Sequence, residues 1–252
     1  MGSRLAPLLL IAGLLVAWEV ACRALDVPLY FLPPPTAILR AIVEDAGALA
    51  ASALRTLIMA LEALVLASVT ATAVALGISF SRTMERAVRP LAVALQVTPV
   101  VAIAPLVVIW AGIDHPGRAI VSLAAVVAFF PIFSGVTAGL AAADPDLERL
   151  FRLYGATRGQ VLARLRLPSA LPFILEGHKV AAGLAIIGAV VAEFVAGSGG
   201  AQGLAWRILE AGNRLKTAEM FAAIFVLAAM AAALNALFAA GERRALKWWR
   251  GR

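Results

Sequence analysis

The side chains that most often carry out chemistry are scarce in this chain, and their spacing matches no catalytic or metal-binding pattern. Cys22 is the single cysteine, which excludes an intramolecular disulfide and a cysteine-clustered metal site. The two histidines, His115 and His178, are 63 positions apart. A Walker A phosphate loop ends in Gly-Lys, but the three lysines directly follow His178, Leu215 and Leu246. We therefore expect a chain that is not an enzyme and holds no cofactor or metal. Since it has no ATP site of its own, any energy for its work is expected to come from another chain or from an ion gradient.

The composition indicates an integral membrane protein. Of 252 residues, 62% are hydrophobic and 15% are charged, whereas soluble domains carry about 25% charged residues. A globule of this size could not be coated with so little polar surface. The net charge of +7 fits the basic cytoplasmic loops of a bacterial membrane protein, so we expect lipid and no nucleic acid as a partner.

The apolar runs predict an all-α fold with about six transmembrane helices, organised as a single transmembrane domain over residues 1–252. The predicted spans are 5–21, 56–80, 91–113, 118–142, 179–196 and 219–241. The first run could instead be a signal peptide, because Arg4 precedes it, but its length and Glu19 favour an uncleaved helix. The prolines at 33–35 stop a helix, and Thr36 can cap the next one.

The distribution of basic residues predicts the orientation. With six spans, both termini lie on one side of the membrane. That side, which includes 81–90, 143–179 and the C-terminal tail, carries 15 of the 22 lysines and arginines. The positive-inside rule then places both termini in the cytoplasm, with the chain in the bacterial inner membrane. The long polar segment 143–172 is therefore predicted to be cytoplasmic.

Residues 143–172 predict two short helices separated by a break. Asp144 and Pro145 are typical of a helix start, and apolar residues follow at helical spacing. Those apolar residues are Leu147, Leu150, Phe151 and Tyr154. Gly155 interrupts the pattern, Thr157 can cap a second amphipathic helix, and Pro168 is expected to end it. The pair could lie on anionic lipid, or it could dock on a cytoplasmic partner.

This segment resembles the cytoplasmic signature of ABC importer permeases. The signature reads E-A-A, three residues, G, nine residues, I, one residue, L-P. Gly155, Leu165, Leu167 and Pro168 match its second half in spacing. The first half departs from it, because Arg149 occupies the acid position.

Further segments are similar to the nitrate, sulfonate and taurine group of these permeases. They are Phe31-Leu32-Pro33-Pro34-Pro35, Thr98-Pro99-Val100, Pro105-Leu106, Ile109-Trp110-Ala111-Gly112-Ile113, Phe130-Pro131-Ile132, Ala192-Glu193-Phe194 and Gly203-Leu204-Ala205. Residues 207–213 are similar to a subset associated with pyrimidine vitamin precursors or riboflavin. Together the segments extend over nearly the whole chain.

The resemblance implies a type I importer architecture with a cytoplasmic coupling helix between spans four and five. It implies three protein partners: a second permease copy, a cytoplasmic ABC ATPase that binds ATP and Mg, and a periplasmic substrate-binding protein. The implied coupling residues are Gly155, Ala156, Thr157, Arg158, Gln160, Leu165, Leu167 and Pro168. Among them, Ala156, Arg158 and Gln160 are expected to contact the ATPase directly.

Four residues are candidates for the translocation path: Glu193, Trp110, Phe130 and Glu62. An ionisable residue inside a span is a functional hypothesis by default, and the aromatic rings could stack on a ring-shaped solute. Each also has a structural interpretation. Glu193 could pair with Arg207 at the water interface, Glu62 could face a neighbouring subunit, and the aromatic residues could be interfacial anchors.

Several questions remain open on the sequence alone. An ion-gradient transporter or channel is the alternative function, although it would need more carboxylates in mid-span than Glu62. Gly135 and Gly139, and similarly Gly188, could pack within the chain or against a second permease. Trp248 and Trp249 resemble an interfacial anchor. The solute could be a sulfonate, nitrate, a pyrimidine precursor or riboflavin.

Overall fold

The computed structural model describes residues 2–81, 83, 84, 86–88, 90, 99–112, 114–196 and 201–251. Every regular element among them is a helix, which confirms the all-α prediction. The chain forms two compact units, Met1–Arg55 with Ala201–Met230, and Thr56–Gly200 with Ala231–Arg252. The single-domain expectation stays a prediction, and each unit is described by itself.

The first unit is built around a small apolar core. It contains α1 (Gly2–Ala24), α2 (Pro35–Glu44), the start of α3 (Ala46–Ser79), α10 (Leu204–Asn213) and the start of α11 (Thr217–Arg250). Ile38 and Leu204, which are 2% and 0% exposed, lie at the centre of this core. Trp18 packs at its edge, 5.9 Å from Phe221 between ring centroids. The connection between α1 and α2 is held by Thr217, whose hydroxyl donates to the Tyr30 carbonyl at 2.7 Å.

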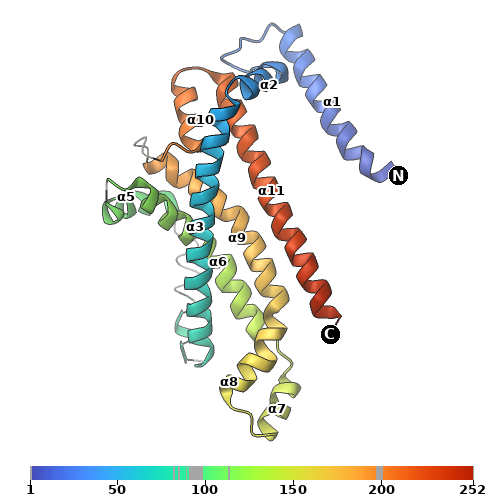
Figure 1. Ribbon diagram of the computed structural model, residues 1–252, viewed down its shortest axis with the longest axis vertical. Helices are drawn as coiled ribbons and strands as arrows, with labels where there is room; N and C mark the ends of the chain where they lie inside the picture. Colours follow the sequence, from blue (N-terminus) through green and yellow to red (C-terminus); the bar gives the residue numbers. More distant parts are fainter. Residues whose placement is uncertain are drawn as a thin grey trace. The chain divides into compact units, whose positions relative to one another are not determined.

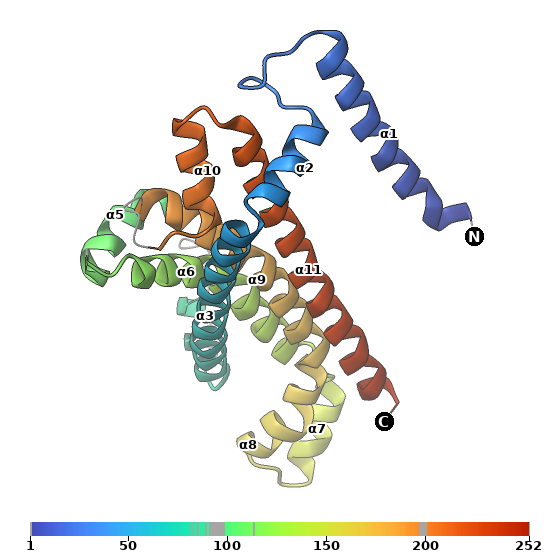
Figure 2. The ribbon, with the colours of Figure 1, turned by 45° about the horizontal axis from the view of Figure 1, so that its top comes forward.

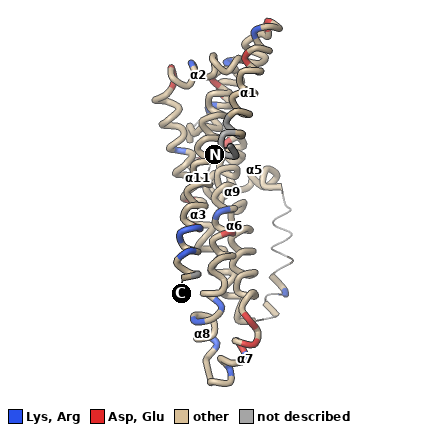
Figure 3. Tube along the Cα trace, turned by 90° about the vertical axis from the view of Figure 1, so that its right-hand side faces the viewer, with Lys and Arg blue, Asp and Glu red and all other residues tan. Residues whose placement is uncertain are grey.

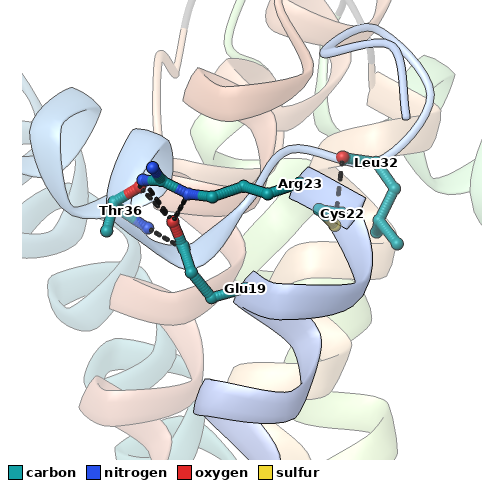
Figure 4. A network of polar contacts seen from close by, with 5 residues as sticks. All are labelled: Glu19, Cys22, Arg23, Leu32 and Thr36. Atoms are coloured by element: carbon teal, nitrogen blue, oxygen red, sulfur yellow. Dashed lines mark hydrogen bonds and ion pairs between the residues drawn. The ribbon is translucent and has the colours of Figure 1, made fainter. Parts of the chain in front are cut away.

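The N-terminus of α2 is capped by a residue of α1 (Figure 4). The Thr36 amide donates to the Glu19 carboxylate at 3.0 Å, and the Thr36 hydroxyl donates to it at 2.8 Å. Arg23 completes the network through an ion pair of 2.6 Å with Glu19. The expectation that Thr36 is the cap is therefore wrong: Pro34 occupies the N-cap position, and its side chain cannot accept a hydrogen bond. A carboxylate distant in sequence satisfies the free amide instead.

The second unit is organised around an antiparallel helix pair. Helices α6 (Pro116–Ala141) and α9 (Leu167–Ala196) lie side by side in both Figure 1 and Figure 2, and α5 (Val100–Ala111) packs against both. Between α6 and α9 come α7 (Pro145–Leu153), α8 (Arg158–Val161) and the π-helix η1 (Leu162–Arg166). The predicted cytoplasmic segment therefore joins the two central helices of this unit.

Glycines allow α6 and α9 to approach at backbone distance. A Cβ atom at Gly139 would lie 2.8 Å from the Ala170 Cβ, and one at Gly135 would lie 2.6 Å from the Phe173 carbonyl. On α9, Cβ atoms at Gly177 and Gly188 would meet the backbone of α6 at 2.6 and 2.9 Å. The sequence left open whether these glycines pack within the chain or against a second permease. In the structure they pack within the chain.

Four helical runs are long and apolar enough to span a membrane, among the residues that the structure describes. They are Ala46–Ser79, Pro116–Ala141, Arg158–Ala196 and Thr217–Trp249, while Val100–Ala111 is apolar but shorter. Part of the third predicted span, residues 91–98 and 113, lies outside the described residues, as do Thr98 and Ile113 of the similar segments. The count of six spans therefore stays a prediction.

The prolines act differently from the sequence-based expectation at two places. Pro99 is the N-cap of α5 rather than a kink within a span, while Pro105 and Pro131 lie inside α5 and α6. Pro168 was expected to end a helix, and it lies in the first turn of α9, which runs on through Pro172. Helices α8, η1 and α9 form one continuous helical run, so Pro168 lies inside that run, directly after the π-helical hydrogen bonds of η1. Helix α9, which contains the predicted span 179–196, begins at Leu167.

The glycine contacts lead to a stability prediction. Gly139→Ala should destabilise the protein by about 1–3 kcal/mol, because the new methyl group overlaps Ala170 in a packed interface. The measurement is the thermal midpoint of the purified protein in one detergent. Gly183→Ala on α9 is the matched control, since a Cβ there has nothing within 4 Å. Equal midpoints for the two variants would contradict the close packing of α6 and α9.

Candidate functional site

The site begins with α7, whose start is set by local polar chemistry. The Asp144 carboxylate accepts the Asp146 amide at 2.8 Å, and Pro145 occupies the first helical position. Asp146 and Glu148 lie in the first turn, where negative charge complements the free amides. Figure 3 shows acidic positions on α7 and basic positions over α8 and the π-helix that follows it. The helix start predicted from the sequence is confirmed.

A glycine in the left-handed region reverses the chain after α7. Gly155 has φ +72°, a conformation that other residues adopt only with strain. Its amide donates to the Arg152 carbonyl at 3.0 Å, and the Ala156 amide donates to the Phe151 carbonyl, also at 3.0 Å. These two bonds form a Schellman motif, and the side chains of Ala156 and Phe151 pack on the same cluster. The turn is therefore rigid.

The next helix starts with a capping box. The Thr157 hydroxyl accepts the Gln160 amide at 3.3 Å, and the Gln160 side chain accepts the Thr157 amide at 2.8 Å. This confirms Thr157 as a helix cap. The Gln160 side chain, expected from the family resemblance to contact a partner, is used within the chain. Arg158 is exposed.

A small apolar cluster holds the two helices together. Val161 and Leu165 are 6% and 7% exposed, and Ala143, 8% exposed, closes the cluster from the end of α6. Leu165 of the signature is therefore a core residue. It lies in η1, a π-helix, where the Leu167 amide donates to the carbonyl five residues back, at Leu162. Leu167 is half-buried and Pro168 is exposed.

An ion pair braces α7 against η1. The Glu148 carboxylate pairs with the Arg166 guanidinium, and Arg152 approaches the same carboxylate at 3.5 Å. The side chains of Glu148 and Arg166 are 20% and 28% exposed, so this pair is better shielded than the surface pair of Arg149 with Asp146. Glu148, which lies one position before the acid position of the signature, thus has an ion-pair partner in Arg166 that the sequence alone did not reveal.

The outer face of α7 is apolar and uncovered. Leu147 and Leu150 are each 45% exposed, and Leu153 and Tyr154 are each 84% exposed. The sequence placed Phe151 on this face, but Phe151 packs inward on the cluster. Leu153 was missed as a surface residue, although its spacing of three from Leu150 could have indicated it.

A groove of about 820 Å³ runs beside this hairpin of α7 and α8. The end of α3 and the end of α6 contribute lining residues such as Ile78 and Leu140. The charged residues that line the groove are Glu148, Arg152, Arg158 and Arg166. Three arginines against one glutamate make the groove electropositive, so it favours acidic groups.

The four candidates for the translocation path lie on four different helices of the second unit. Glu193 is buried on α9 at 4% exposure, and Phe130 on α6 is half-buried, with its ring edge-on to Phe129 at 5.3 Å. Trp110 near the end of α5 is 78% exposed, and Glu62 in the middle of α3 is exposed. In the first unit, the Arg207 guanidinium donates to the Ser52 hydroxyl at 2.8 Å.

The left-handed turn leads to a second stability prediction. Gly155→Val should destabilise the hairpin by about 1–2 kcal/mol, since a Cβ is unfavourable at positive φ, and Gly155→Asn should cost less. Space is not the cause, because a Cβ at Gly155 meets nothing within 4 Å. Hydrogen exchange of residues 145–166 measures the effect. Gly159→Ala, an equally open position within α8, is the control and should increase protection.

Comparison with protein families matches residues 63–245 to the binding-protein-dependent transport system inner membrane component. The chain is 34% identical to the formylaminopyrimidine transport permease of Halalkalibacterium halodurans, over 88% of this chain and 87% of that protein. It is 32% identical to the riboflavin transport system permease of Chloroflexus aurantiacus, over 93% and 87%. It is also 32% identical to the taurine transport system permease of Escherichia coli, over 93% and 86%.

The fold also has a counterpart among solved structures. A crystal structure of an amino acid ABC transporter matches 81% of this chain and 96% of its own, with a TM-score of 0.65 and 17% identity. Nothing in these comparisons supports the alternative of an ion-gradient transporter. The chain belongs to the family of inner-membrane permease components of binding-protein-dependent ABC importers.

Proposed function

We propose that two copies of this chain form the translocation path of an ABC importer and grip a separate ATPase through the hairpin of α7 and α8. The observation that carries the proposal is the exposed apolar face of α7 on a turn locked by backbone hydrogen bonds. A rigid element with an uncovered apolar face is suited to dock in a groove of another protein.

The charges near this face suggest what the partner surface is like. Arg152 and Arg158 are exposed beside the apolar residues, and they line the electropositive groove. The partner should therefore offer an apolar cleft with an acidic rim. An interfacial helix pair on anionic lipid would use the same arginines. We favour the protein partner because the chain belongs to a family of ABC importer permeases, which work with a separate ATPase.

The remaining parts of the importer follow from the family. Both termini and the α7–α8 hairpin lie on the cytoplasmic side in this proposal, where the ATPase binds ATP and Mg. A periplasmic binding protein delivers the solute on the opposite side. Gly155 and Thr157 shape the hairpin, Leu165, Leu167 and Pro168 set its return into α9, and Ala156 and Arg158 lie at the contact.

We further propose a small nitrogen heterocycle as the solute. The relative with 34% identity is named for formylaminopyrimidine and another for riboflavin, and residues 207–213 are similar to the same subset. Phe130 and Trp110 supply aromatic surface for a flat ring, and Glu193 supplies a buried acceptor for ring N–H groups. Glu62, which is exposed in the middle of α3, is assigned to the same path.

The docking face can be tested with a charge substitution. Tyr154→Asp should lower the amount of ATPase that co-purifies with the tagged chain at least tenfold, because it places a carboxylate in an apolar contact. The measurement is quantitative mass spectrometry of the purified complex. Leu39→Ser, an exposed position on α2 at 61%, is the control and should leave the ATPase bound. Full co-purification with Tyr154→Asp would favour the lipid interpretation.

The solute can be tested by uptake. Cells that express the chain with its co-purifying ATPase and binding protein should accumulate labelled formylaminopyrimidine, and a hundredfold excess of taurine should not compete. Phe130→Leu should reduce uptake several-fold while ATPase binding is retained. Accumulation of taurine instead would overturn the proposed solute and leave the proposed coupling intact.

A further inference from the structure

Two prolines four residues apart leave one backbone carbonyl at the start of α9 without its usual donor. In an α-helix the carbonyl of residue i accepts the amide of residue i+4. For Pro168 that residue is Pro172, which has no N–H. Both prolines lie within α9, so the gap falls in the first turns after the hairpin of α7 and α8.

A tryptophan of the C-terminal helix supplies the missing donor. The Trp249 indole Nε1–H donates to the Pro168 carbonyl oxygen at 3.0 Å. Trp249 is half-buried, whereas its neighbour Trp248 is 60% exposed. The sequence treated the two tryptophans alike, as an interfacial anchor, and the structure gives them different surroundings. Trp249 reaches the proline of the signature itself.

A second contact fixes the same two helices along their length. The Lys179 ammonium donates to the Glu242 carboxylate at 2.9 Å, with the two side chains 26% and 16% exposed. Since 168 pairs with 249 and 179 pairs with 242, the helices run antiparallel. The C-terminal end of α11 lies beside α9 in Figures 1 and 2. Helix α9, which follows the hairpin, is thus held by α11 at two positions.

We propose that Trp249 is a positioning residue for coupling, because its indole N–H replaces the Pro172 amide at the Pro168 carbonyl and keeps the first turns of α9 helical. This inference rests on the proposed docking of the ATPase on α7. A push on the hairpin passes through η1 into the first turn of α9. A carbonyl without a donor there weakens the first turns of α9, and local unwinding would absorb that movement instead of transmitting it.

The test is a double-mutant cycle in the complete complex of the chain with its ATPase, reconstituted in lipid nanodiscs. Trp249→Phe keeps an aromatic ring and removes the donor. It should lower kcat for ATP hydrolysis by about two- to tenfold and leave KM for ATP unchanged, because ATP binds on the other subunit. Hydrogen exchange at residues 158–171 should become faster. Pro172→Ala returns an amide to the Pro168 carbonyl, so in that background Trp249→Phe should cause no further loss of kcat.

Trp18→Phe is the matched control for removing an indole N–H. The Trp18 Nε1 atom is buried in the first unit without a hydrogen-bond partner, so this substitution removes a donor that bonds nothing. It should not change the exchange of residues 158–171. An unchanged kcat with Trp249→Phe, or an equal loss of kcat with and without Pro172→Ala, would overturn the inference.

The cycle also separates this inference from the proposed function. If the ATPase does not co-purify with the unmodified chain, the proposed function fails. If the ATPase binds and Tyr154→Asp releases it, while Trp249→Phe leaves kcat and exchange unchanged, only the positioning role of Trp249 fails.

Discussion

The second unit depends on the close approach of α6 and α9. Glycines at 135 and 139 on one helix and at 177 and 188 on the other bring the two backbones together at distances that a Cβ would not permit. In a membrane, where apolar side chains gain little by leaving lipid, such van der Waals contact is a main source of helix association. The hairpin of α7 and α8 connects these same two helices, so their packing determines where it is presented.

The hairpin and the helix ends illustrate a second constraint, which is that each free backbone group needs a partner. The Gly155 and Ala156 amides donate to carbonyls at the end of α7. At the start of α8, the Thr157 hydroxyl and the Gln160 side chain accept the free amides. At α2 the partner is the Glu19 carboxylate, and at the start of α9 it is the Trp249 indole. The first two solutions are local in sequence, whereas the last two come from residues far away. The distant ones tie separate helices together.

These constraints explain how the proposed mechanism could transmit movement. The cluster of Phe151, Val161 and Leu165 and the ion pair of Glu148 with Arg166 make the hairpin a stiff unit. A stiff unit that joins two tightly packed helices passes a displacement to both of them. A flexible loop would absorb the same displacement through its own dihedral angles.

The sequence by itself determined the membrane class, the helical fold, the position of the polar hairpin and the family, because these depend on composition, on hydrophobic periodicity and on the spacing from Gly155 to Pro168. It also determined the caps at Asp144 and Thr157, whose partners lie two or three residues away. Only the tertiary structure decided that Phe151 faces inward while Tyr154 faces outward, that Glu148 pairs with Arg166, and that α9 continues through Pro168. The physical reason is distance along the chain: a hydrogen bond across 81 positions, such as that of Trp249 with Pro168, leaves no periodic trace in the sequence.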